Sequence, residues 1–416
     1  MTNGHDIPHT SMPDGTLRLS GVGVAGLAGR HDVMVKDGFV ADVVPAGPAV
    51  VEAGGGFVTP LFADAHVHLD KTHTIARIRA GTPAPIESLF DAIALMEEDR
   101  PNWTAADIRL RASRALEAAF AHGVGAVRSH VDWVSPDVPA AWPVLCELRK
   151  EWKGRVDLEI AALLRGDLLP DAGDEIAAQV RRDEAVFGAF FYRNADLATR
   201  VGTMFALAAH HDLKLDFHVD EGLEPEADGL SLIIDATARF GMAGRVLCGH
   251  ACSLSLRPAD EVKRIVDAGA SAGVGLVVLP TTNLHLQDRG TGRTPRLRGL
   301  APLKEARAAG MDVMIASDNV GDAFYPYGDY DPLSVLRLAV PVAHLEPDAW
   351  LDSITSLPAR WCGSDLAMPI GKGMPADFIW HGATDMGDLI SRPRSERIVY
   401  RRGTPLPAQN QDWRNA

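Results

Sequence analysis

The chain has 416 residues, of which 46% are hydrophobic and 23% charged, as in a globular protein with a sizeable core. The formal net charge of -14 argues against nucleic acid or an anionic membrane as a partner, because like charges repel. Four cysteines without a CxxC pair argue against a disulfide framework and a thiolate zinc site. With neither a signal peptide nor a long apolar segment in the sequence, we expect a cytoplasmic protein.

Short apolar runs cut by Gly and Pro fill both flanks of the chain. They occupy residues 16–58 and, near the other end, "ADFIWHG" and "RIVYRRG" within 367–405. None shows a helical period, so they predict small β-strands, and we expect one β-sandwich assembled from both termini. The first 15 residues and the tail after about Pro405 are polar, so we expect loosely ordered ends.

Between the flanks, apolar or β-branched runs alternate with helical stretches such as "TAADIRLRASRALEAAFAHG", whose final Gly suits a helix C-cap. This alternation predicts a parallel sheet and an α/β fold. Eight runs are candidate strands: 57–69, 123–132, 156–164, 185–191, 213–220, 245–251, 274–280 and 312–318. Eight strands close a TIM barrel. We therefore expect a (β/α)8 barrel over 59–366, completed by helices from about Pro332 to Leu366.

Histidines and one aspartate stand where the predicted strands end. Strand one ends in His66 and His68, strand five in His218, strand six in His250 and strand eight in Asp318. Active sites of such barrels lie at these strand ends, and residues two apart in a strand share one face. A single histidine is usually a core or loop residue. Five such residues at one end of four strands indicate a mixed nitrogen and oxygen metal site suited to Zn²⁺ or Fe²⁺.

One acid follows a predicted ligand. Glu221 lies three residues beyond His218, where a carboxylate can move a proton between water and a departing nitrogen. As an isolated residue it would more often be a solvated loop acid. In contrast, His122, His210 and His211 close predicted helices, and we assign them no role in the site.

At these residues the chain resembles the cytosine deaminase branch of the amidohydrolase superfamily, over nearly its whole length. The matching stretches are "DAHVHLDKT", "RSHVD", "VDLEIAALL", "DFHVDE", "GHACS", "PTTNLHLQDRG" and "ASDNVGDAFYPYGDYDPLSVL". The resemblance implies a distorted TIM barrel with a β-sandwich, a homo-oligomer, and one divalent ion, Zn²⁺ or Fe²⁺. It implies that His250 polarises the hydrolytic water and that Glu221 shuttles protons. The implied metal ligands are His66, His68, His218 and Asp318.

The activity that the resemblance implies is metal-dependent hydrolytic deamination of a small nitrogen heterocycle, a cyclic amidine, with release of ammonia. We expect Asp318 and His250 to accept and orient a proton of the attacking water, and Glu221 to protonate a ring nitrogen. Strand four ends in "FFYRN" and has no lysine to bridge two metals, so one metal is expected.

Two alternatives remain open. In the first, the same site hydrolyses an N-alkylamine or a cyclic amide, as in triazine-degrading relatives. The other is a non-catalytic binding protein on the same barrel, against which the complete ligand set argues. The HxE and PCxxC signatures of deaminases that edit polynucleotides are absent.

Two departures from the cytosine deaminase pattern concern the substrate. Arg165 aligns with a glutamine that hydrogen-bonds the pyrimidine, and as a donor it favours a ring carbonyl or a carboxylate. Asn319 replaces a second aspartate, and this "SDN" triplet is similar to N-isopropylammelide isopropyl amidohydrolase, which lacks the counterpart of Glu221. Gln287 and Phe324 are further candidate substrate-binding residues.

Each of these substrate residues has a structural alternative. In that alternative Asn319 only caps its loop, and His285 takes the place of Gln287. For Phe324 and its neighbour Tyr325, the alternative is packing under a proline turn. Lys71 follows "HLD"; a place facing the pocket is one alternative, but we expect a surface lysine.

Overall fold

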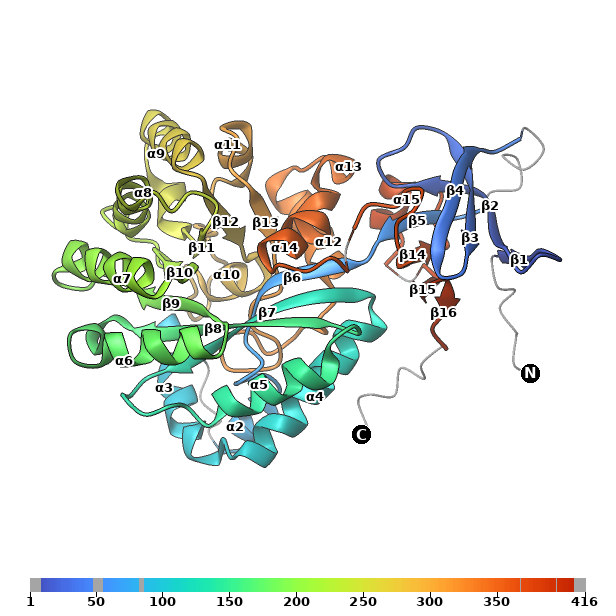
Figure 1. The fold of residues 1–416 in the computed structure, drawn as a ribbon. Coiled ribbons are helices and arrows are strands. Elements are labelled where there is room, and N and C mark those ends of the chain that lie inside the picture. The colour runs from blue at the N-terminus through green and yellow to red at the C-terminus, as the bar shows by residue number, and fades with distance from the viewer. Residues whose placement is uncertain (1–8, 48–54, 82–85, 367, 394, 408–416) are drawn as a thin grey trace.

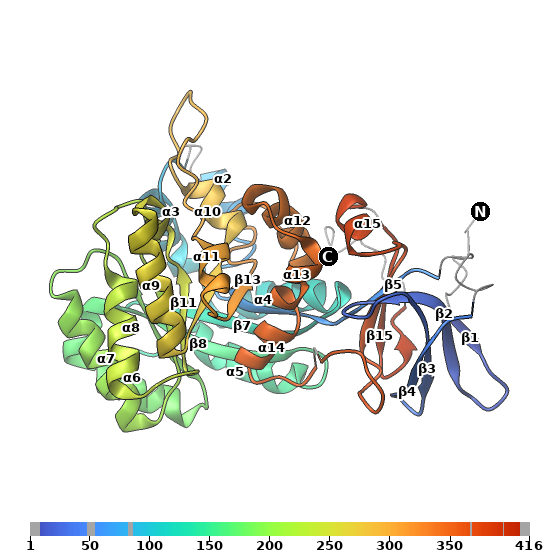
Figure 2. The ribbon, with the colours of Figure 1, turned by 90° about the horizontal axis from the view of Figure 1, so that it is seen from above.

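The computed structural model describes residues 9–47, 55–81, 86–366, 368–393 and 395–407. A large α/β body and a smaller β-sheet lie side by side (Figure 1). The small sheet is drawn in blue and in red, so both ends of the chain contribute to it. Seen from above, the sheet again lies beside the barrel and not across its helices (Figure 2).

The large body is a barrel of eight parallel strands in the order β13-β12-β11-β10-β9-β8-β7-β6. A bridge between Val67 and Asp318 joins the first strand to the end of the last, and the Asp318 amide donates to the His66 carbonyl at 2.8 Å. The predicted TIM barrel is therefore confirmed. Its strands are β6 (Phe62–Val67), β7 (Val124–Trp133), β8 (Asp157–Arg165), β9 (Val186–Phe191), β10 (Leu215–Val219), β11 (Val246–His250), β12 (Val274–Val278) and β13 (Val313–Ile315).

Helices surround the barrel strands (Figures 1 and 2). The helix expected over 104–123 is α4, which the Thr104 side chain caps by accepting from the Asp107 amide and which ends before Gly123 at φ +85°. The helices of this body are α2 (Ile75–Gly81), α3 (Leu89–Asp99), α4 (Ala105–Ala121), α5 (Ala141–Trp152), α6 (Leu169–Arg182), α7 (Leu197–His211), α8 (Gly229–Phe240), α9 (Ala259–Ala272), α10 (Pro280–Leu286), α11 (Leu303–Ala308), α12 (Pro332–Ala343), α13 (Pro347–Trp350) and α14 (Ser356–Trp361).

The small sheet joins strands from both termini, as predicted. Hydrogen bonds connect them in the order β16-β15-β14-β5-β2-β3-β4, and β1 pairs with β2. Leu19, Val33, Phe378 and Tyr400 belong to a hydrophobic core of its own. The strands are β1 (His9–Ser11), β2 (Leu17–Val24), β3 (Arg30–Lys36), β4 (Phe39–Pro45), β5 (Phe57–Pro60), β14 (Phe378–His381), β15 (Arg397–Arg401) and β16 (Thr404–Pro405), with α15 (Met386–Ser391) between β14 and β15.

The apolar run 57–69 serves both bodies. Its first part, β5, pairs with β2 and β14 in the small sheet, whereas β6 pairs with β7 in the barrel. Both parts are buried, so hydrophobicity does not reveal where the chain leaves one sheet for the other. The domain limits 16–58, 59–366 and 367–405 stay a prediction.

The cysteines, the helix lengths and the chain ends were each the subject of an expectation from the sequence. The four cysteines are free thiols, three of them buried and Cys146 half-buried. In the part of the chain that the structure describes, every helix is too short or too polar to cross a bilayer.

The two ends of the chain were expected to be loosely ordered. His9–Ser11 instead forms β1, and residues 1–8 and 408–416 lie outside the described part.

Candidate active site

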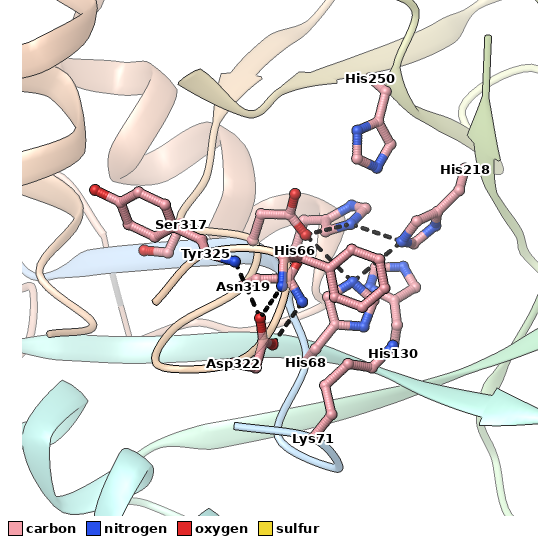
Figure 3. Close-up of polar contacts among 12 residues, drawn as sticks. His66, His68, Lys71, His130, His218, His250, Ser317, Asn319, Asp322 and Tyr325 are labelled. Carbon is pink, nitrogen blue, oxygen red and sulfur yellow. Dashed lines mark hydrogen bonds and ion pairs between the residues drawn. The ribbon is translucent and has the colours of Figure 1, made fainter. Parts of the chain in front are cut away.

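Three imidazoles and one carboxylate converge at the C-terminal ends of β6, β10 and β13 (Figure 3). The Nε2 atom of His218 lies 3.0 Å from that of His66 and 3.2 Å from that of His68. Asp318 Oδ1 lies 3.2 Å from His68 Nε2 and 3.6 Å from His66 Nε2. All four side chains are buried. The structure thus brings together four residues that lie up to 252 positions apart in the sequence.

The spacing of these atoms fits a single divalent ion. Ligand atoms about 2.1 Å from a tetrahedral zinc ion lie about 3.4 Å from one another, close to the distances found here. Burial lowers the pKa of His66, His68 and His218 well below the usual value, so each imidazole is neutral and offers a lone pair. Neutral imidazoles facing one another beside a carboxylate form a donor set suited to zinc or iron.

His250 and Asp318 both adopt an uncommon backbone conformation. Their φ angles are +72° and +60°, in the left-handed region that residues other than glycine seldom occupy. Such conformations cluster at functional sites, where the surrounding fold maintains them. One ligand atom each of His66, His250 and Asp318 lies within 4.8 Å of the others. The strand-end turns of β11 and β13 therefore direct His250 and Asp318 toward the imidazole cluster.

His250 is held from behind by an amide. The Asn283 Nδ2 atom lies 3.1 Å from His250 Nδ1, and burial lowers the pKa of His250 to about 4. The ring is therefore neutral at pH 7. Its Nε2 atom has no hydrogen-bond partner among the described residues, so it is available to a bound water.

Glu221 is a buried carboxyl next to this histidine. Its Oε1 atom lies 3.6 Å from His250 Nδ1. Burial raises the pKa of Glu221 to about 8; Asp318 adds to this rise and Lys71 opposes it. A carboxyl that keeps its proton at pH 7 can act as a general acid.

Gln287 and Asn319 are both buried close to these groups. The Gln287 side-chain amide donates to the backbone carbonyl of Glu221, so it holds the segment that carries this acid. The Asn319 amide donates to Asp322 Oδ2 at 2.7 Å. Asp322 also accepts from the Phe324 amide at 2.9 Å, which ties Asn319 to the loop after β13.

Arg165 and Phe324 differ in exposure. The Arg165 side chain is 54% exposed at the end of β8, and its Nε atom donates to Asp167 Oδ1 at 3.1 Å. No contact within the described residues joins Arg165 to the imidazole cluster. Phe324 is half-buried, with its ring centroid 5.3 Å from Lys71 Nζ.

The expectation that Lys71 is a surface residue is wrong. The side chain is only 4% exposed, and Nζ donates to Asp132 Oδ1 at 2.6 Å. Asp70 Oδ2 accepts from the Asp132 amide at 2.9 Å, which ties the loop after β6 to the end of β7. Burial opposes the charge on Lys71, but Asp132 and Asp70 outweigh it and raise its pKa above the usual value. Composition alone favours exposure for lysine and does not reveal a partner 61 residues away.

His130 in β7 lies beside the cluster, although it was not among the residues predicted from the sequence. This fully buried ring lies 4.1 Å from that of His66 and 4.7 Å from that of His218, centroid to centroid. One nitrogen of His130 also lies within 4.8 Å of the other three imidazoles. Its Nε2 atom lies 3.1 Å from Asp216 Oδ1, which places a carboxylate next to that nitrogen. The signal was the alternation in "RSHVD", which places His130 and Asp132 on one face of the strand.

A second group of possible ligands lies away from the barrel strands. His211 Nε2 is 2.8 Å from Asp174 Oδ1, and His210 lies beside them at the end of α7. His210 and Asp174 are exposed. An ordinary surface ion pair accounts for this contact, in agreement with the absence of a predicted role.

A hydrolase of the TIM-barrel type with a buried metal-ligand cluster is the class that this fold and site define. The model of the amidohydrolase family matches residues 160–398, and the chain belongs to this family, as its motifs implied. The pterin deaminase of Rhizobium rhizogenes is 37% identical over 92% of this chain and 90% of its own length. The N-isopropylammelide isopropyl amidohydrolase of Pseudomonas sp. strain ADP is 24% identical over 79% of this chain and 80% of its own.

The fold is also that of a solved deaminase. The crystal structure of 5-methylcytosine deaminase from Klebsiella pneumoniae, bound to 5-fluorocytosine, matches with a TM-score of 0.80. The match covers 94% of this chain and 97% of that one, with 24% sequence identity. It confirms the distorted barrel with a sheet from both termini.

Proposed function

We propose that the protein is a one-metal hydrolytic deaminase that removes an amino group from a small nitrogen heterocycle. The observation that carries this proposal is the convergence of three neutral imidazoles and the Asp318 carboxylate beside the buried, protonated Glu221. The 37% identity to a pterin deaminase makes a pterin the first substrate to test.

In this proposal one divalent ion, Zn²⁺ or Fe²⁺, is bound by His66, His68, His218 and Asp318. Such an ion lowers the pKa of a water molecule toward neutrality and so supplies a nucleophile at pH 7. The role of the ligands is to present lone pairs without protons, which their lowered imidazole pKa values allow.

The remaining steps are proton transfers by side chains of this chain. Water attacks the ring carbon that bears the amino group, Asp318 accepts its proton, and His250 orients it through Nε2. Glu221 donates its proton to the adjacent ring nitrogen, which gives a tetrahedral carbon. The proton on Asp318 then passes to the amino group, the carbon–nitrogen bond breaks and ammonia leaves. The hydroxyl proton returns to the Glu221 carboxylate, which restores the acid and leaves a ring carbonyl.

The proposal extends to the four predicted substrate-binding residues and to the state of the protein in the cell. Gln287, Asn319 and Phe324 line the site close to Glu221 and Lys71, whereas Arg165 contacts substrate only if that substrate reaches the exposed end of β8. We also propose a cytoplasmic homo-oligomer, on the strength of the family resemblance. Sedimentation of the purified protein tests the oligomer.

An ammonia-release screen tests the function. Metal-replete protein is assayed with pterin, isocytosine, cytosine, isoguanine and aminotriazines, and we expect ammonia, with pterin among the substrates. Removal of the metal by a chelator should lower the rate at least about 100-fold, and added Zn²⁺ should restore it. Release of an alkylamine from an N-alkyl triazine without any ammonia would favour the alternative activity, hydrolysis of an N-alkylamine. A fully metal-loaded protein that releases neither would overturn the proposal.

A further inference from the structure

Lys71 is a buried cation that the proposed deamination does not use. Burying an ammonium group costs free energy unless charged or hydrogen-bonding partners surround it. An ammonium has three N–H donors, yet Asp132 Oδ1 is the one hydrogen-bond partner of Nζ within the described residues. Asp132 is itself shared, because Arg100 Nη2 lies 3.5 Å from its other oxygen. Lys71 therefore retains donor capacity in a place from which bulk water is largely excluded.

The ammonium group faces the proposed metal and acid groups. Lys71 follows the proposed ligand His68 by three residues, in the loop after β6. In Figure 3 the Lys71 side chain extends from the loop below the cluster toward His130. The Phe324 ring covers Nζ at 5.3 Å, within the range of a cation–π contact. Nζ thus lies under the Phe324 ring, beside the histidine cluster.

An ammonium selects acceptors. It carries no lone pair, so it stabilises a carbonyl oxygen or a negatively charged ring of the ligand. A ligand with an amino group in place of that carbonyl would bring one hydrogen-bond donor against another. A charge-assisted hydrogen bond in a site that excludes water separates two such ligands by about 10- to 100-fold in affinity. When water attacks the ring, charge that spreads onto a neighbouring carbonyl oxygen would also be stabilised by the same ammonium.

We infer that Lys71 binds a carbonyl oxygen of the heterocycle, so that the substrates of this site are amino-oxo heterocycles rather than diamino or triamino ones. The inference rests on the proposed function and names the class of substrate within it. Asp132 is a positioning residue that holds the ammonium, and Phe324 covers it. The buried Lys71 then supplies the hydrogen-bond donor to the substrate carbonyl that the sequence had suggested for Arg165.

The test compares two ligands that differ at one ring position. We expect Lys71→Met to lower kcat/KM for 2-amino-4-oxopteridine about 10- to 100-fold and that for 2,4-diaminopteridine less than about 3-fold. The Kd of 2,4-dioxopteridine, which keeps the carbonyl but has no amino group to lose, should rise by the same 10- to 100-fold. Lys263→Met is the matched control, because that side chain is 73% exposed and pairs with Asp267 on α9.

The effect of leaving the Asp132 carboxylate without its ammonium partner must be separated from the loss of substrate binding by Lys71. Lys71→Met leaves the half-buried Asp132 with Arg100 as its remaining cation among the described ion pairs, so the double variant Lys71→Met/Asp132→Leu removes both charges. Both variants should bind one metal per chain, and the double variant should unfold within a few degrees of wild type and show the same selective loss. Equal losses for the oxo and diamino compounds, or a selective loss in Arg165→Met instead, overturn the inference.

The two proposals fail in different ways. If wild-type protein releases no ammonia from any heterocycle, the proposed function fails, while the Kd of the dioxo compound still reports on Lys71. If wild type deaminates 2,4-diaminopteridine as fast as the oxo compound and Lys71→Met changes neither, the function stands and the assignment of Lys71 is wrong.

Discussion

Three buried carboxyls near the imidazole cluster keep their protons to a higher pH than exposed carboxyls do. Burial raises the pKa of Glu221 to about 8, that of Asp322 to about 7 and that of Asp64 to about 6. Asp322 and Asp64 are engaged by backbone amides of the loop and strand around Asp318. Glu221 has no such amide among the described contacts, which leaves its proton available for transfer.

The pKa of Glu221 predicts an alkaline limit to activity. The carboxyl carries the proton it donates at pH values below about 8 and loses it as the pH rises further. We therefore expect kcat/KM to fall as the pH passes upward through about 8, measured as ammonia release from a neutral substrate. Bound metal, being positive, moves this limit to lower pH and not to higher pH.

The matched variant for this prediction is Glu221→Gln, which keeps the shape and removes the proton. It should lower kcat about 10²- to 10⁴-fold and leave the metal content at one ion per chain. Wild-type kcat in this variant would contradict the assignment of the acid. Retained metal together with lost activity separates proton transfer from metal binding.

Strand ends supply the reactive side chains, and a neighbouring strand makes room for them. Gly249 in β11 is paired with His218 in β10. A β-carbon at position 249 would lie 2.8 Å from His66 Cε1 and 3.0 Å from His66 Nδ1. Because glycine has no side chain, position 249 leaves space for the His66 imidazole inside the barrel.

Gly249→Ala should displace His66 and weaken the metal site. Because the added carbon meets a ring atom at less than 3.0 Å, we expect the metal affinity to fall about 10-fold or more and kcat with it. Dialysis against metal buffers, followed by metal analysis, measures the affinity. Gly81→Ala is the control, since a β-carbon there meets nothing within 4 Å. Unchanged affinity in Gly249→Ala would show that His66 shifts without cost or is not a ligand.

The small sheet and the barrel are joined by an ion pair between a half-buried arginine and a buried aspartate, as well as by the chain. Arg397 of β15 donates to both oxygens of Asp331, through Nη1 at 3.1 Å and Nη2 at 2.9 Å. Asp331 also caps α12 by accepting from the Leu333 amide. Burial opposes the charge on Asp331, but Arg397 outweighs it and brings the pKa of Asp331 down to about 2.

Removing this pair should destabilise the whole molecule in a pH-dependent way. At neutral pH we expect Arg397→Leu to cost about 3 kcal/mol of unfolding free energy, because it leaves a buried carboxylate without its cation. Since the pKa of Asp331 is depressed, its contribution is complete above about pH 4 and is lost as the pH falls toward about 2. The difference in Tm between variant and wild type should therefore shrink below pH 4.

The control for that measurement is a surface pair. Arg360 and Asp312 form an ion pair at 2.6 Å, but the arginine is 63% exposed, so Arg360→Leu should cost less than about 1 kcal/mol. A cost in Arg397→Leu no larger than this, or a difference in Tm that does not change below pH 4, would rule out the interdomain role.

The local pattern of the chain was enough to predict the barrel and the proposed ligands. Hydrophobic runs, helix ends and the two-residue period of strands are properties of neighbouring residues. They identified the eight strands and placed His66, His68, His218, His250 and Asp318 at strand ends. Because all parallel strands of a barrel end on the same side, convergence followed from this placement alone.

Only the tertiary structure decided which groups meet across that end of the barrel. Lys71 turns inward because of Asp132, His130 joins the cluster beside Asp216, and Gly249 leaves space for His66. These contacts join residues that lie between 61 and 183 positions apart. Charge state, burial and available space depend on such distant neighbours, whereas periodicity records only adjacent ones.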